Sequence, residues 1–161
     1  MKTIPDKVID KTWKRIDELT PEQGQRLMEK MTEEQPFVVA YLLAVEETIM
    51  AESERGDLVM IGLIIWQSLS TEKSPLRMVT QKDMETAEAA NVTFLEELEA
   101  GSEIAYMDSM QTLMASYNQM PLLGAVIEAI MAGNEEEPDL APENIGLTLL
   151  HLKTIIDCLD Q

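Results

Sequence analysis

Apolar residues recur along this chain at the spacing of an α-helix, and this periodicity constrains the fold more than any other feature. The clearest case is the segment 4–19, where the apolar positions are Ile4, Val8, Ile9, Trp13, Ile16 and Leu19. These positions follow the i, i+3, i+4, i+7 spacing of a helix with one buried face, whereas the strict alternation of a β-strand is almost absent from the chain. The sequence therefore predicts an all-α fold, either a helical bundle or a short α-solenoid.

Capping and breaking residues divide the first half into four helices. Thr20 and Gln23 fit a capping box, which predicts a second helix over residues 21–31. Pro36 is a favourable first residue for a third helix, which carries "FVVAYLLAVEETIM". A break is expected at "ESERGD", where Asp57 caps the fourth helix, and "STEKSPLR" is expected to be the loop that ends this half.

The second half shows the same plan. Four helices are expected there: residues 81–100 capped by Thr80, a helix that follows Gly101 and is capped by Ser102, residues 121–132, and a last helix from about Glu143. The acidic stretch "GNEEEPDLAP" separates the last two as a loop. No glycine- or serine-rich linker divides the chain, so residues 1–161 are expected to form a single domain of about eight helices.

Short phrases of the first half recur in the second half in the same order. "QRLM" at 25–28, "PFVVAYLLAV" at 36–45 and "IGLIIW" at 61–66 match "QTLM" at 111–114, "PLLGAVIEAI" at 121–130 and "IGLTLL" at 145–150. The pattern predicts a tandem duplication of a four-helix unit, with pseudo-repeats at 4–72 and 80–160, although leucine-rich helices can also match by chance. Gly62 and Gly146 are expected to let a neighbouring helix approach closely in each copy.

The apolar runs are too short for a membrane helix. The longest, residues 37–45 and 58–66, have nine residues each, whereas a span needs about 20. The first residues lack the apolar stretch of a signal peptide, and the single cysteine, Cys158, cannot form an internal disulfide. These features predict a soluble, cytoplasmic protein.

The negative charge is concentrated in the second half. Residues 1–82 contain 11 Lys and Arg and 14 Asp and Glu, whereas residues 83–161 contain 16 Asp and Glu and one basic residue, Lys153. Phosphate binding needs clustered basic residues, so neither nucleic acid nor a membrane is expected as a partner. Acidity of this kind can simply keep a protein in solution, but it also suits a basic protein partner.

The sequence supplies no catalytic constellation. His151 is the only histidine and is expected to fill a structural polar position, while Cys158 lies about 10 Å further along the same helix. That separation is too large for the two side chains to share a zinc ion or to form a catalytic pair. A di-iron Glu-x-x-His motif is also missing, because Thr148 occupies the position three residues before the histidine. No catalytic, cofactor-binding or metal-binding residue is therefore assigned.

A row of carboxylates follows one face of the helix at 81–100. Its members are Glu85, Glu88, Glu96, Glu99 and, just beyond the helix, Glu103. A metal site needs carboxylates that converge from different helices, so a single row indicates a solvated face. Met107, Met110 and Met114 share a face of the next helix, where core filling is expected, although methionine-rich surfaces also accept partner helices.

These features together predict a protein–protein interaction module, such as an adaptor, a regulator or a chaperone-like protein. Its acidic second half would bind a basic partner through the carboxylate row. The basic residues Lys7, Lys11 and Arg15 share a face of the first helix and could instead attract a second copy in a two-fold dimer. Two alternatives remain: an all-α metal-dependent hydrolase that uses helix carboxylates, and a structural homo-oligomer.

Overall fold

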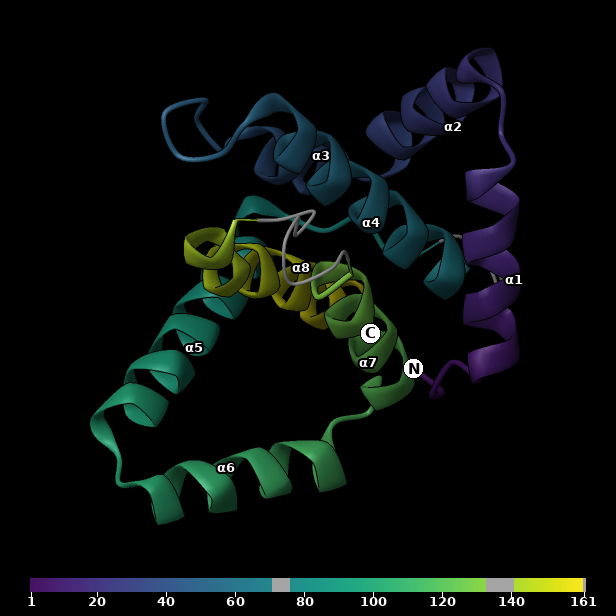
Figure 1. Ribbon diagram of the computed structural model, residues 1–161. Helices are drawn as coiled ribbons and strands as arrows, with labels where there is room; N and C mark the ends of the chain where they lie inside the picture. The colour runs from purple at the N-terminus through teal and green to yellow at the C-terminus, as the bar shows by residue number, and fades with distance from the viewer. Residues whose placement is uncertain (71–75, 133–140, 161) are drawn as a thin grey trace.

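The computed structural model describes residues 1–70, 76–132 and 141–160. Within these ranges all regular secondary structure is helical (Figure 1). The helices are α1 Asp6–Asp17, α2 Pro21–Glu34, α3 Pro36–Leu43, α4 Glu52–Ser70, α5 Gln81–Ala100, α6 Glu103–Ser116, α7 Met120–Ile130, the short 3-10 helix η1 Pro142–Asn144, and α8 Ile145–Leu159. The predicted all-α class is confirmed. The loops predicted at 70–77 and 133–142 lie for the most part outside the described residues.

Three of the predicted helix starts are confirmed by their capping hydrogen bonds. The Thr20 side chain accepts from the Gln23 amide at 3.3 Å, and the Gln23 side chain accepts from the Thr20 amide at 2.9 Å, which completes the capping box of α2. Thr80 begins α5 in the same manner, and the Ser102 hydroxyl accepts from a backbone amide at the start of α6. Each bond satisfies an amide that the helix itself leaves unpaired.

The boundary between α3 and α4 differs from the prediction. Helix α3 ends at Leu43, and α4 already begins at Glu52, so that Asp57 lies inside the helix and does not cap it. The earlier start has a local cause, since the Glu54 carboxylate accepts from the Ala51 amide at 2.8 Å. A carboxylate three residues into a helix that binds the amide preceding the first turn fixes the start there.

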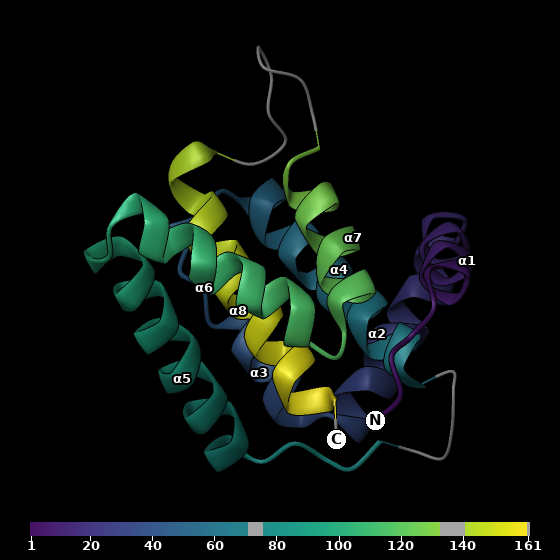
Figure 2. The ribbon, with the colours of Figure 1, turned by 90° about the horizontal axis from the view of Figure 1, so that it is seen from below.

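Helices α4 and α8 form the centre of the molecule. Helix α8 packs against α3, α4, α5 and α7, while α1 packs against α4 and α7, and α2 packs against α3 and α4 (Figures 1 and 2). In α4 every residue from 61 to 69 is buried, which explains why this part of the helix is apolar on nearly all its faces. The fully buried side chains include Trp66, Ile64, Ile65, Leu152, Ile155 and Ile156.

The two halves share part of their packing, but the surroundings of their glycines differ. In the first half α1 and α3 pack against α4, and in the second half α5 and α7 pack against α8. A methyl group added to Gly62 would lie 2.6 Å from the nearest Leu42 side-chain carbon, so the close approach expected there is confirmed. The same expectation for Gly146 is wrong, because nothing lies within 4 Å of a methyl group at that position. The duplication is therefore not confirmed and stays a prediction.

A buried glutamine connects the first half to the second. Gln35, the residue before α3, donates from Nε2 to the Arg77 carbonyl at 3.0 Å. Its Oε1 accepts from the Val79 amide at 2.9 Å. The side chain therefore satisfies two backbone groups, the Arg77 carbonyl and the Val79 amide, of the segment that precedes α5.

A second buried glutamine connects the second half to the first through the same kind of contact. Gln119, the residue before α7, donates from Nε2 to the Lys2 carbonyl and accepts at Oε1 from the Ile4 amide, both at 3.0 Å. It thereby holds the segment that precedes α1. Each half thus fixes the entry to the first helix of the other, and Gln119 uses the same atoms as Gln35 for these two bonds. Gln119 also donates to the Asp160 carboxylate at 2.7 Å.

Candidate functional site

The second half of α5 and the whole of α6 extend away from the helical core. In α5 only Met84 and Asn91 are buried, and none of the residues from 92 to 100 is. None of the 14 residues of α6 is buried, and its main contact is with α5. Figure 1 shows α5 and α6 as a V whose first limb begins against α8, while the far half of α5 and α6 stand away from the core; we refer to residues 92–116 as the α5–α6 arm.

The arm is fixed at its first end by a polar contact between α5 and α8. Asn91 donates from Nδ2 to the Asp157 carboxylate at 2.8 Å and to the Thr154 hydroxyl at 3.1 Å. Lys153 donates to the Asn91 carbonyl oxygen at 2.7 Å and to Asp157 at 2.8 Å. The amide of Asn91 is therefore fully engaged, which explains a polar residue in the middle of the buried face of α5.

The far end of the arm is also bonded to the Asp157 carboxylate. Tyr117, the residue after α6, donates from its hydroxyl to the Asp157 carboxylate at 2.6 Å. Burial and the nearby carboxylate both raise the pKa of Tyr117, so the phenol stays protonated and remains a donor. The Lys153 ammonium lies 4.7 Å from the centre of the tyrosine ring. Asp157 therefore holds both ends of the arm, a role that the sequence analysis missed.

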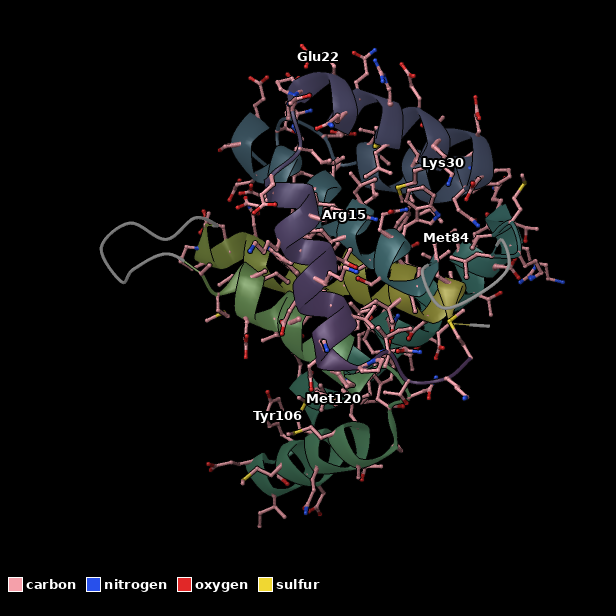
Figure 3. The ribbon with its side chains drawn as sticks, turned by 90° about the vertical axis from the view of Figure 1, so that its right-hand side faces the viewer. Arg15, Glu22, Lys30, Met84, Tyr106 and Met120 are labelled. Carbon is pink, nitrogen blue, oxygen red and sulfur yellow. The ribbon has the colours of Figure 1, made fainter. Side chains whose placement is uncertain are left out.

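The apolar side chains of α6 are at the surface. The exposed fractions are 74% for Ile104, 46% for Tyr106, 63% for Met107 and 59% for Met114. The expectation that Met107, Met110 and Met114 fill a core is therefore wrong: Met107 and Met114 are exposed, Met110 is half-buried, and α5 is the main contact of α6 among the described helices. Figure 3, seen from the side of α1, shows α6 set apart from the other helices with Tyr106 on it. Isolated exposed methionines are ordinary, but four large exposed apolar residues on one helix of 14 residues are not.

A shallow groove lies in the angle between α5 and α6. It has a volume of about 390 Å³ and is lined by Phe94 from α5 and by Asp108, Ser109, Thr112, Leu113 and Ser116 from α6. The lining combines aromatic and aliphatic carbon with hydroxyl groups and one carboxylate. Such a surface can take the side of an amphipathic chain, because it offers both apolar contact and hydrogen-bonding groups at its edge.

The arm has an uncompensated negative charge. Residues 92–116 contain Glu96, Glu97, Glu99, Glu103 and Asp108 and no Lys or Arg. The only basic residue of the second half, Lys153, is engaged by Asp157 at the base of the arm. The field of these carboxylates is therefore not neutralised within the arm and is available to a partner of opposite charge.

The predicted carboxylate row is divided by the structure. Glu85, Glu96, Glu99 and Glu103 are exposed, and the last three belong to the arm. Glu88 is instead half-buried and accepts from the Tyr41 hydroxyl of α3 at 2.8 Å. Burial and this carboxylate raise the pKa of Tyr41. Glu88 therefore joins α5 to α3, and it does not belong to the solvated face that the helical spacing predicts.

The predicted basic residues lie on the other side of the molecule. Lys7 and Lys11 are exposed on α1, whereas Arg15 donates from its guanidinium to the Gln67 carbonyl oxygen of α4. Figures 1 and 2 both place α1 and α5 at opposite sides of the central helices α4 and α8. The structure therefore does not bring the basic and acidic candidates together within one chain.

His151 and Cys158 both lie in the interior. His151 is buried, its Nδ1 lies 3.0 Å from the Leu147 carbonyl oxygen, and its ring stacks on Tyr41 with 4.6 Å between the centres. Burial lowers the pKa of His151, while burial raises the pKa of Cys158 to about 12. A neutral imidazole and a protonated thiol are the forms that such surroundings favour at neutral pH.

Among the described residues, no group of three or more His, Cys, Asp or Glu side chains is arranged to hold a metal ion. Asp157 and Asp160, which share the spacing of a possible ligand pair, are engaged by hydrogen bonds from Tyr117 and Gln119. No described helix has both the length and the apolar composition required to cross a membrane.

Comparison with known protein families, with curated proteins and with solved structures finds no match to this chain. The feature that the packing of the core does not explain is the α5–α6 arm, which is anchored at both ends, apolar on its surface and acidic.

Proposed function

We propose that this protein is a protein–protein interaction module and that its α5–α6 arm binds a basic, amphipathic helix of a partner. The observation that carries the proposal is the exposure of the apolar side chains of α6, since none of its 14 residues is buried. A helix of this length is only marginally stable without tertiary packing. Covering its apolar side with a partner would therefore stabilise both the arm and the complex.

The chemistry of the arm favours a helix as the occupant. Met107 and Met114 have flexible, polarisable side chains that adapt to different apolar surfaces. A partner helix would place its leucine or aromatic residues at i, i+3, i+4 and i+7 against them, which is the spacing by which amphipathic helices bind apolar surfaces. Over its 14 residues α6 is about 21 Å long, which matches four turns of a partner helix.

The charge of the arm favours a basic partner. Five carboxylates and no cation lie within residues 92–116. Lysine or arginine residues along the rim of a partner helix would meet them, which raises the association rate and selects against acidic helices. This attraction should weaken as the salt concentration rises above about 0.15 M, where the Debye length is about 8 Å.

A foreign partner fits the geometry better than a reciprocal dimer. Lys7 and Lys11 are on the side of the molecule opposite the arm (Figure 2). Two copies that paired one basic face with one acidic arm would leave the second arm unpaired, so such contacts would continue head to tail and would not close as a two-fold dimer. The test is light scattering across salt concentrations, with the Lys7→Glu/Lys11→Glu variant beside the wild type.

The proposal is tested with two synthetic peptides of about 18 residues, which is five helical turns. One is amphipathic and basic, with leucine at helical spacing and lysine elsewhere, and the other has the same composition in an order that breaks the apolar face. We expect only the amphipathic peptide to bind in a fluorescence-anisotropy titration. Replacing Met107 and Met114 by serine should weaken it by about tenfold, which corresponds to about 1.4 kcal/mol.

The control variant replaces Met78 and Met131 by serine. These two methionines are as exposed as those of α6 but lie outside the arm. Since all four side chains are on the surface, we expect the stability of either variant to change by no more than about 0.5 kcal/mol. Equal loss of peptide affinity in the two variants, or equal binding of both peptides, would contradict the proposal.

A further inference from the structure

A second concave site lies on the other side of the molecule, between α1, α4, α7 and α8. It is a pocket of about 550 Å³, within the range of about 300–1,000 Å³ that small-molecule sites occupy. Its apolar walls are formed by Ile9, Trp13, Leu58, Ile61, Ala125 and Ala129. The pocket shares no residue with the α5–α6 arm, so the inference that follows is independent of the proposed function.

The polar residues of the pocket are predominantly acidic. Asp10 from α1, Asp57 from α4 and Glu128 from α7 contribute carboxylates, and no Lys or Arg belongs to the described lining. Carboxylates that approach from three helices around apolar walls produce a negative potential at the pocket. An acidic lining alone does not define a ligand, but two further side chains indicate one.

The first of these is Glu54, a buried carboxylate in the wall of the pocket. It accepts from the backbone amides of Ala51 and Ala141, both at 2.8 Å, and from the Asn144 side chain at 3.0 Å. Burial raises the pKa of Glu54, but these hydrogen bonds outweigh burial and hold the pKa below its usual value. All of these donors are uncharged, so the negative charge of the carboxylate is not neutralised by them.

The second is Thr148, which reaches the pocket from α8. Its side chain is 2% exposed, and its hydroxyl has no hydrogen-bond partner within the described residues. A buried hydroxyl without a partner destabilises the folded state. A ligand in the pocket that carries a hydrogen-bonding group can supply the missing partner.

From this combination we propose that the pocket binds a small organic amine, whose apolar body lies against the Trp13 and Leu58 walls and whose ammonium faces the carboxylates. The volume accommodates an aromatic or aliphatic amine of ordinary metabolite size. An ammonium also interacts favourably with the face of an indole ring. A divalent cation is a poor occupant, since it needs six or more oxygen ligands in place of apolar walls.

Three probes that share one apolar body test the charge requirement: 4-phenylbutylamine, 4-phenylbutanol and 4-phenylbutyrate. Each is titrated into the full chain and followed by calorimetry and by the thermal unfolding midpoint. We expect the amine to bind and to raise the midpoint in a concentration-dependent way. The alcohol should bind about tenfold more weakly or worse, and the carboxylate should not bind. Binding of none of the three, or equal binding of the amine and the alcohol, would overturn the proposal.

Variants locate the amine in this pocket. Asp10→Asn combined with Glu128→Gln should lower the amine affinity by about tenfold, because it removes two charges at the pocket. Asp17→Asn combined with Glu33→Gln removes the same two charges from exposed positions outside the pocket; this variant is the matched control and should leave the affinity unchanged. If the control lowers the affinity as much as the pocket variant does, the amine is attracted by net charge alone and the site is wrong.

Thr148→Val separates a binding role of the hydroxyl from a purely structural one. The change keeps the shape of the side chain and removes the unpaired hydroxyl. We expect it to raise the unfolding midpoint of the free protein and at the same time to weaken binding of 4-phenylbutylamine severalfold. An unchanged amine affinity would show that the hydroxyl does not contact the ligand and would overturn its part in the site.

Discussion

Replacing Gln119 by methionine should lower the free energy of unfolding far more than a substitution of a surface residue does. The side chain is fully buried and makes three hydrogen bonds, to the Ile4 amide, the Lys2 carbonyl and the Asp160 carboxylate, at 3.0, 3.0 and 2.7 Å. Methionine has a similar volume, so the cavity term is small, but the buried Ile4 amide loses its acceptor. An orphaned buried donor costs about 1–3 kcal/mol and each lost neutral bond about 0.5–1.5, so we expect a loss of about 2–4 kcal/mol.

The equivalent change at Gln35 should act in the same way. It removes two hydrogen bonds and leaves the Val79 amide without its acceptor, so we expect a loss of about 2–3 kcal/mol. The assay is urea unfolding followed by circular dichroism, together with hydrogen exchange of the Ile4 and Val79 amides. Gln81→Met is the control, because that amide bonds only to Glu85 on the surface, and it should change stability by no more than about 0.5 kcal/mol. If the two buried variants unfold at the same urea concentration as this control, the account of the glutamine contacts is wrong.

The remaining predictions concern two glycines and two buried titratable groups. Gly62→Ala should leave stability unchanged or lower it by up to about 2 kcal/mol, because its methyl group would overlap Leu42, whereas Gly146→Ala should raise stability by up to about 1 kcal/mol; denaturant unfolding of both variants measures the difference. Burial lowers the pKa of His151 below the value of 6.5 in the unfolded chain, so its contribution to stability is present above pH 6.5 and is lost as the pH falls through the folded pKa. His151→Phe should flatten that part of the stability profile between pH 5 and 7. Burial raises the pKa of Cys158 to about 12, so the native thiol should react with a thiol reagent at pH 8 only as fast as the protein unfolds, and rapid reaction under native conditions would contradict its burial.

Local features of the sequence predicted the elements of the fold well. The capping residues Thr20, Thr80 and Ser102 begin helices as expected, because a cap acts through amides only two or three residues away. The start of α4 was misplaced for a related reason. Glu54 reads as a surface residue in the sequence, and only its bonds to Ala51, Ala141 and Asn144 make it a helix-capping, buried group.

The candidate site was harder to predict, because periodicity shows which face of a helix is apolar but does not show what covers it. The methionine face of α6 looks in sequence like the apolar face of any core helix, and yet no residue of α6 is buried by the part of the chain that the structure describes. The anchor of the arm joins Asn91, Tyr117 and Asp157, which are separated by 26 and 40 residues in the chain, so no local pattern connects them. A polar residue within an otherwise apolar helix face, as at Asn91, was the one signal available.

The most direct test of the account is an NMR titration of the protein with isotope-labelled methionine methyl groups against the basic amphipathic peptide. Met107 and Met114 are exposed on the arm, whereas Met31 and Met50 are buried in the core, so the labels report on both regions in one experiment. We expect the signals of Met107 and Met114 to shift as the peptide is added and those of Met31 and Met50 to stay in place. A peptide that binds without moving the two arm signals, or that moves the core signals equally, would contradict the assignment of the α5–α6 arm as the binding surface.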